Sequence, residues 1–183
     1  MLLSHKVSAQ AEFVRNKGQW PDQVLYQTAL PNGNLWTEKG GFTFQFYDSA
    51  ILDWMHPRVP ADTIPGIYME HSYKVHFDGS NDPSEIGIEK LPHYYNYFKG
   101  NDSSRWAEGC EVYRKCRLNN IYAATDVVVY SNSSSLKYDF IVHSGGNADD
   151  IRLRLEGAEI VLVNDELIIT TSVNTVTEKA PYA

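Results

Sequence analysis

Hydrophobic and polar residues alternate over most of this chain, and this period of two constrains its fold more than any other feature. In FTFQFYD, Phe42, Phe44 and Phe46 fall on one face of an extended strand, with Thr43 and Gln45 on the other. The segments SYKVHFD (72–78), LKYDFIV (136–142) and IRLRLEG (151–157) repeat the pattern. Alternation of this kind indicates strands with one buried face. We therefore expect Phe44, Tyr138 and Leu153 in the core and Arg152 at the surface.

Turn residues fall where these strands are expected to end. LPNGNL (30–35) contains Asn-Gly, the strongest short hairpin signal. Two further reversals are expected at Lys39-Gly40-Gly41 and at Asn164-Asp165. Helical periodicity is nearly absent, apart from one short turn that Asp102 or Ser103 could N-cap. These patterns predict an all-β fold, either an antiparallel β-sandwich or an open barrel with very little helix.

The length and composition fit one globular domain. The chain has 183 residues, of which 43% are hydrophobic and 21% are charged. We expect residues 1–11 to be a leader or the remnant of a secretory signal peptide, because Ser8 to Ala11 resembles a small-residue cleavage region. Residues 12–183 are expected to form a single all-β domain, the N-terminal module of a longer protein. Within it, the proline-rich stretch from Asp48 to Tyr68 is expected to be a surface loop or covering flap.

Several function classes are disfavoured by the residue content. A net charge of −7 argues against nucleic acid as a partner, because phosphate binding needs clustered Lys and Arg. No apolar run approaches the roughly 20 residues that cross a bilayer, so no membrane insertion is expected. Cys110 and Cys116 lie six residues apart in an expected strand, too far for a disulfide, and we expect both thiols to be free.

Motifs that carry chemistry are scarce. His71 and His76 fall on opposite faces of an expected strand, so they do not form a shared metal site, and we expect neither metal nor cofactor. DGSNDPSE (78–85) is rich in oxygen ligands but reads as an Asx-rich turn rather than a calcium loop. No Gly-x-Ser-x-Gly elbow is present, and we expect no enzymatic activity. A carboxylate pair for glycoside hydrolysis is a spatial feature, so the sequence leaves that alternative open.

Aromatic residues provide the candidate binding site. Tyr94, Tyr95, Tyr97 and Trp106 lie close together in LPHYYNYFKGNDSSRW (91–106). Exposed aromatic rings stack on sugars, so Tyr95, Tyr97 and Trp106 form a candidate carbohydrate-binding platform, with Tyr94 on the opposite face. In the competing interpretation, Tyr95 and Tyr97 face the core and leave no platform.

Five blocks of sequence resemble one known family. EFVRNKGQWPDQVLY (12–26) is similar to the opening Asn-x-Gly-Gln motif of a domain near the N-terminus of large secreted Bacteroidetes surface proteins. Those proteins carry β-propeller (SBBP) repeats, PKD-like domains, or gliding-motility or type IX secretion sorting tails. The later blocks, in the same order as in the family, are YYNYFKGND (94–102) with Trp106, VYRKCRLNNIYAATDVVVYSN (112–132), LKYDFIVHSGGNADDIRLRLEGA (136–158) and LIITTSVNTVTEKAPYA (167–183). One departure is Ala123-Ala124-Thr125, which replaces the family's usual Pro-Gly-Ile turn.

The resemblance implies export, to the cell surface or as a secreted protein, and it brings no known activity or catalytic residues. We expect a non-catalytic extracellular module with a structural, adhesion or assembly role, whose partners are polysaccharides or other cell-surface proteins. A carbohydrate-binding module is the alternative, and a glycan-active hydrolase is a third. DSA (48–50) and DTI (62–64) resemble the short O-glycosylation acceptor of exported Bacteroidetes proteins, which makes Ser49 and Thr63 candidate glycosylation sites.

The opening motif itself is expected to be a loop-and-edge element. In NKGQWP (16–21), Trp20 is expected to bury its ring, while Asn16 and Gln19 bind backbone groups of the loop.

Overall fold

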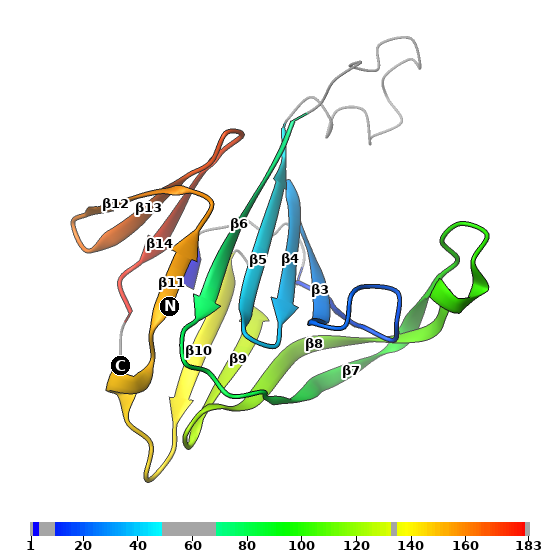
Figure 1. The fold of residues 1–183 in the computed structure, drawn as a ribbon, viewed down its shortest axis with the longest axis horizontal. Helices are drawn as coiled ribbons and strands as arrows, with labels where there is room; N and C mark the ends of the chain where they lie inside the picture. Colours follow the sequence, from blue (N-terminus) through cyan, green and yellow to red (C-terminus); the bar gives the residue numbers. More distant parts are fainter. Residues whose placement is uncertain (1, 4–9, 49–68, 133–134, 182–183) are drawn as a thin grey trace.

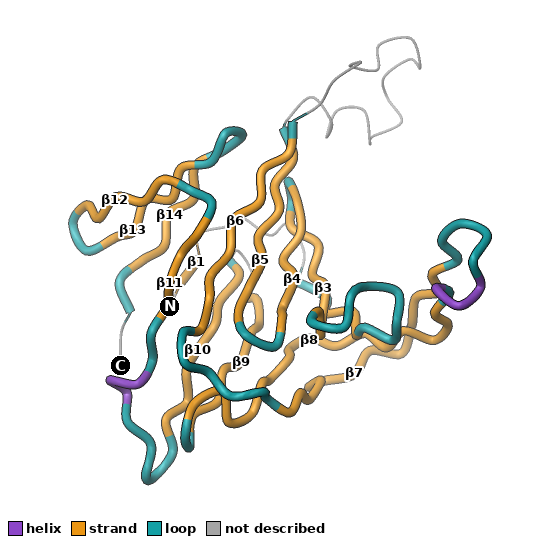
Figure 2. Tube along the Cα trace, viewed as in Figure 1, coloured by secondary structure: helices purple, strands orange, loops and turns teal. Residues whose placement is uncertain are grey.

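β-Strands make up nearly all of the regular secondary structure in the described part of the chain (Figure 1). The computed structural model describes residues 2–3, 10–48, 69–132 and 135–181. Its strands are β1 (Leu2–Leu3), β2 (Phe13–Arg15), β3 (Val24–Leu30), β4 (Gly33–Glu38), β5 (Gly41–Tyr47), β6 (Glu70–Phe77), β7 (Ser84–Tyr97), β8 (Ala107–Tyr122), β9 (Thr125–Ser131), β10 (Leu136–Val142), β11 (Leu153–Glu156), β12 (Glu159–Val163), β13 (Glu166–Thr170) and β14 (Thr175–Lys179). Two short 3-10 helices, η2 (Ser103–Arg105) and η3 (Ala148–Asp150), lie in loops (Figure 2). The predicted all-β class with very little helix is confirmed.

The strands are joined by hydrogen bonds in the order β11-β6-β5-β4-β3-β2-β8-β9-β10-β1-β14-β13-β12, with β7 paired to β8 off this path. The pairs run antiparallel, and the sheet curls into a half-barrel with a smaller sheet beside it (Figure 1). Of the two predicted architectures, the β-sandwich and the open barrel, the structure has the open one. Strand β1 lies between β10 and β14, so two residues of the predicted leader take part in the sheet.

Strands β7 and β8 form a long hairpin whose far part extends away from the half-barrel (Figure 1). We call this part, residues 91–112, the arm. At its end, Asp102 N-caps η2 by accepting a hydrogen bond from the Ser104 N–H, as predicted. A small second core formed by Val14, Ala107, Cys110 and Val112 joins the base of the arm to β2. The arm is therefore anchored by packing as well as by its strand pairing.

The β3–β4 hairpin forms where it was predicted, but its turn is displaced by one residue. Leu30 pairs with Gly33, so the two turn residues are Pro31 and Asn32 rather than Asn-Gly. Proline has a fixed φ that suits the first central position of a turn. Gly33 serves another purpose, because a Cβ at this position would lie 1.8 Å from the carbonyl oxygen of Gln45 on β5. The glycine permits close approach of two strands.

The β12–β13 turn agrees with its prediction. Val163 pairs with Glu166, and the two residues between them, Asn164 and Asp165, have φ values of 50° and 63°. Both angles are left-handed, which is the conformation that Asn and Asp tolerate best among non-glycine residues.

The main core lies inside the half-barrel and follows the predicted alternation. Phe42, Phe44 and Phe46 from β5 pack with the inward residues of β6 and β10. Phe44 stacks on Tyr73 with ring centroids 5.0 Å apart, and Phe42 contacts Tyr138 at 5.3 Å. Phe44 and Tyr138 are buried as expected. Leu153 packs against this core but is only partly buried, because β11 is the edge strand of the sheet.

The two cysteines lie on one strand, β8, and both thiols are free and buried, as predicted. Burial raises the pKa of Cys116, whose side chain has no solvent exposure. The candidate glycosylation sites Ser49 and Thr63 lie outside the described residues, as does most of the predicted loop around them. Among the helices that are described, none has the length and apolar character needed to cross a membrane.

Candidate functional site

The predicted platform residues lie on the arm, but the structure does not bring all three together. Tyr95 and Tyr97, on β7, have ring centroids 6.5 Å apart. Tyr95 is 43% exposed and Trp106 is 42% exposed, whereas Tyr97 is half-buried. Trp106 follows η2, donates its indole N–H to the Gly100 carbonyl and packs its ring on Phe98. Tyr95 and Tyr97 therefore form one group, and Trp106 belongs to the end of the arm.

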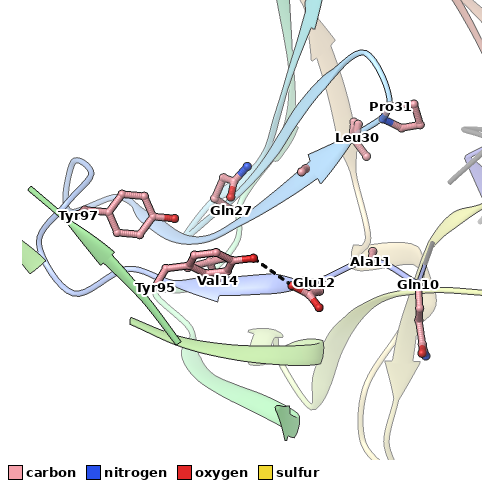
Figure 3. A pocket seen from close by; sticks show the side chains of 10 residues that line it. Gln10, Ala11, Glu12, Val14, Gln27, Leu30, Pro31, Tyr95 and Tyr97 are labelled. Atoms are coloured by element: carbon pink, nitrogen blue, oxygen red, sulfur yellow. Dashed lines mark hydrogen bonds between the residues drawn. The ribbon is translucent and has the colours of Figure 1, made fainter. Parts of the chain in front are cut away.

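Tyr95 and Tyr97 line a groove of about 520 Å³ between the arm, β3 and the segment that leads into β2 (Figure 3). Its lining residues are Gln10, Ala11, Glu12, Val14, Gln27, Ala29, Leu30, Pro31, Tyr95 and Tyr97. The volume lies within the range of about 300–1,000 Å³ that is usual for small-molecule sites. Figure 3 shows Tyr95, Tyr97 and Gln27 around one end of the groove.

Glu12 is the single charged residue among the described residues that line this groove. Its carboxylate accepts a hydrogen bond from the Tyr95 hydroxyl at 3.4 Å and lies 3.2 Å from His93 Nε2. Arg114 Nη1 lies 3.8 Å away. Partial burial, and then the nearby Glu12 charge, raise the pKa of Tyr95. The groove is thus lined mainly by apolar groups, hydroxyls and amides, and its one carboxylate has a cationic neighbour.

The opening motif forms a hydrogen-bonded loop that carries Trp20. Asn16 Nδ2 donates to the carbonyls of Trp20, Pro21 and Val24, and Asn16 Oδ1 accepts from the Gly18 and Trp20 N–H groups. Gln19 accepts from the Lys17 N–H and donates to the Arg15 carbonyl. The predicted role of Asn16 and Gln19 is confirmed, although Trp20 is only partly buried.

Trp20 lies between two other rings. Its centroid is 5.3 Å from that of Trp36 on β4 and 5.2 Å from that of Tyr97 on the arm, in edge-to-face geometry. Lys99 Nζ lies 5.9 Å from the Trp20 centroid and 5.6 Å from that of Tyr97. The three partly exposed rings form one continuous aromatic surface, favoured by quadrupole interactions between them.

Side-chain amides continue this surface across the outward face of β3, β4 and β5. Gln27 Nε2 donates to Asn34 Oδ1 at 2.6 Å, and Asn34 Nδ2 donates to the Tyr47 hydroxyl at 2.8 Å. Gln45 Oε1 accepts from Asn34 at 3.3 Å and from the Trp36 indole N–H at 3.4 Å. We call Trp20, Trp36, Tyr97, Gln27, Asn34, Gln45 and Tyr47 the aromatic–amide face. Sequence reasoning missed it, although uncharged amides at alternate outward positions of neighbouring strands were a visible signal.

Two carboxylates on the other side of the arm base share one cation. Arg15 Nη2 lies 2.5 Å from Glu85, and Arg15 Nη1 lies 3.6 Å from Glu111. Hydrogen bonds from Lys90 and then Tyr113 hold the pKa of Glu111 at about 2. A carboxylate that is ionised at neutral pH cannot be the proton donor that a glycoside hydrolase needs. Glu111 therefore does not supply the acid of the hydrolase alternative.

A further charged cluster surrounds Asp126, at the start of β9. Its Oδ2 accepts from Arg117 Nε at 3.1 Å and lies 2.6 Å from His143 Nε2, while its Oδ1 accepts from the Asn120 N–H at 2.8 Å. The adjacent turn contains Ala124 with a φ of 48°, which is the conformation that a glycine would adopt more readily. The Asp126 cluster holds together the end of β8, this turn and the end of β10.

The two histidines of β6 make separate structural contacts. His71 donates from Nε2 to the Gly157 carbonyl and accepts the Ser172 N–H at Nδ1. His76 pairs with Glu156 at 3.1 Å. Across the described part of the chain, no group of three or more His, Cys, Asp or Glu side chains is arranged to hold a metal ion.

Comparison with known proteins gives one match. Neither the curated proteins nor the solved structures contain a match to this chain. A family model described as "Domain of unknown function (DUF7948)" matches residues 13–183, which is nearly the whole chain. The chain therefore belongs to the DUF7948 family.

Proposed function

We propose that this domain is a non-catalytic extracellular module of a cell-surface or secreted protein, and that it serves assembly through the open edge of β12. The observation that carries the assembly role is the exposure of this strand. Its apolar residues Ile160, Val161, Leu162 and Val163 are between 38% and 66% exposed. Among the described strands, β12 pairs only with β13, so its other edge has unpaired backbone groups.

Edge strands of soluble proteins are normally protected by lysine, proline or a β-bulge. The EIVLV sequence of β12 contains neither lysine nor proline, and its pairing with β13 is continuous in register. Such an edge favours the addition of another β-strand, in which backbone hydrogen bonds supply affinity and the side chains supply specificity.

The partner that best fits this edge is β12 of a second copy of the chain. Antiparallel pairing about a two-fold axis at Val161 places Ile160 opposite Leu162 and Glu159 opposite Val163. No like charges then face each other, and apolar residues meet at the centre. Because the strand is short, the contact is small and the association is expected to be weak.

Sedimentation velocity over a wide range of concentrations tests the proposal. Wild-type protein should shift reversibly from monomer to dimer. Val161→Lys should weaken the dimer about tenfold or more, because two ammonium groups would face each other at the axis. Ile86→Lys is the matched control, because Ile86 on β7 is 51% exposed and Val161 is 49% exposed.

Mixing two variants makes the test specific. Val161→Lys and Val161→Glu should each be largely monomeric at concentrations where the wild type is a dimer, and an equimolar mixture should regain the dimer because opposite charges then meet at the axis. A wild type that stays monomeric at every concentration overturns the proposal. Dimers that persist in both single variants place the contact elsewhere and also overturn it.

The extracellular location and the lack of catalysis rest on the sequence. The resemblance to secreted surface proteins supports export, and fractionation of native host cells with a specific antibody tests it. Release of reducing ends from polysaccharides measures hydrolase activity. Cytoplasmic protein, or sustained release of reducing ends, would contradict the respective part of the proposal.

A further inference from the structure

The aromatic–amide face has a composition that differs from the rest of the outward strand surface. Its polar members are neutral amides and a phenol, linked by side-chain hydrogen bonds across β3, β4 and β5. One charge of each sign contacts it: Lys99 lies near the Trp20 and Tyr97 rings, and the Glu70 carboxylate accepts a hydrogen bond from Gln45 Nε2 at 3.2 Å. These bonds fix the planes of the amides, so that their other donors and acceptors point in defined directions. An amide offers two N–H donors and an oxygen with two lone pairs, which matches the paired donor and acceptor character of sugar hydroxyls.

The aromatic part of this face lies directly beside the amides. Trp36 is paired in register with Gln27, and Trp20 joins Trp36 to Tyr97 through ring contacts. The apolar face of a pyranose ring packs on such rings, while its equatorial hydroxyls reach groups at their rim. Gln27 and Tyr97 also line the groove (Figure 3), so the face and the groove adjoin through these two residues.

The charge of the groove determines the class of ligand. Among its described lining residues, Glu12 alone is charged, and it lies beside His93 and Arg114. An acidic polysaccharide would bring carboxylates next to Glu12, and a polycation would find a single, already paired anion. A neutral, hydroxyl-rich chain matches the lining best.

We propose that the aromatic–amide face and the adjoining groove bind a neutral polysaccharide, with sugar rings stacked on Trp36 and Tyr97 and hydroxyls bound by Gln27 and Asn34. The site keeps Tyr95 and Tyr97 from the predicted platform and replaces Trp106 with residues of β3 and β4. It is independent of β12, so binding and dimerisation can fail separately. A single site of this kind binds weakly, and repeated copies on a cell surface would raise the overall affinity.

Affinity electrophoresis through gels that contain single polysaccharides tests the proposal. The panel contains neutral β-glucan, xyloglucan, mannan and starch, with alginate and polygalacturonate as acidic members. We expect at least one neutral polymer to retard the wild type. Gln27→Ala and Tyr97→Ala should each weaken that retardation about tenfold. Tyr94→Ala is the matched control, because Tyr94 lies on the same strand with its side chain exposed on the other face.

Gln27→Glu is a second test of binding, needed if Tyr97→Ala destabilises the arm. It retains the size of the side chain but replaces the amide that donates to Asn34 Oδ1 with a carboxylate, so it should also abolish the retardation. A far-UV circular dichroism spectrum like that of the wild type should show that the variant is folded. Failure of all four neutral polymers to retard folded wild-type protein overturns the proposal. Binding restricted to the acidic polymers, or equal binding by wild type and Gln27→Glu, also overturns it.

Discussion

Replacing Asp126 by asparagine should remove a charge on which the β8–β9 turn depends. Asp126 is nearly buried and accepts hydrogen bonds from Arg117, His143 and the Asn120 backbone. Asparagine keeps the shape of the side chain and one acceptor oxygen. It loses the negative charge that attracts the two basic neighbours.

The size of the effect follows from the pKa of Asp126. Burial works to raise this pKa, but hydrogen bonds from Arg117 and His143 outweigh it and lower the pKa from 3.8 to about 2. A shift of this size corresponds to about 2.4 kcal/mol at most. The side chains of Arg117 and His143 are 31% and 46% exposed, so solvent screens part of the interaction. We expect Asp126→Asn to lower the free energy of unfolding by about 1–2 kcal/mol at pH 7.

The pH dependence distinguishes this charge effect from a packing defect. Because the pKa is lower in the folded state, the stabilisation is complete above the unfolded-state pKa of about 3.9 and is lost as the pH falls toward 2. We expect urea unfolding at pH 7, 5, 4 and 3 to show that the free energies of unfolding of wild type and Asp126→Asn become more similar as the pH falls. The control Asp22→Asn, at an exposed position, should change stability by less than about 0.5 kcal/mol. A constant difference across this range, or none at pH 7, would refute the reasoning.

Three further predictions concern the core, the thiols and the opening loop. Phe44→Ala should lower the free energy of unfolding in urea by about 3–5 kcal/mol, because Phe44 is buried. Arg152→Ala should lower it by less than about 0.5 kcal/mol, because Arg152 is exposed. Equal losses would reverse the assignment of the buried and exposed faces. Cys110 and Cys116 should react with a thiol reagent slowly in the folded protein and rapidly in urea, and a mass deficit of two hydrogens under non-reducing conditions would contradict their free state. Asn16→Ala should destabilise the protein by about 1–3 kcal/mol because several backbone groups lose their partner, and an unchanged urea midpoint would show that water replaces the side chain at no cost.

The sequence predicted those features that depend on neighbouring residues. The alternation of hydrophobic and polar residues identified the buried side chains of β5 and β6, because successive side chains of a strand point to opposite faces. The loop at Asn16 and Gln19 could also be predicted from the sequence, since the hydrogen bonds of these side chains reach only nearby residues. The exact position of the β3–β4 turn could not be predicted, because it depends on the close approach of Gly33 to β5.

The candidate site depends on contacts between distant segments. Gln27, Asn34 and Gln45 become neighbours only through the register of three strands, which period-two patterns leave undetermined. Trp20 reaches Tyr97 only because the arm packs against β2 through the small second core. The separation of Trp106 from Tyr95 and Tyr97 likewise follows from the shape of the arm end, where η2 directs its ring onto Phe98.

Amide hydrogen exchange over residues 159–163 tests the proposed assembly role most directly, because it reports on the backbone groups of the open edge itself. Mass spectrometry of the peptide that covers β12 should show exchange that slows as the wild-type concentration increases. In Val161→Lys the exchange should stay fast at every concentration. Exchange in the wild type that is fast at all concentrations, or a slowing that Val161→Lys shares, would contradict pairing through this strand.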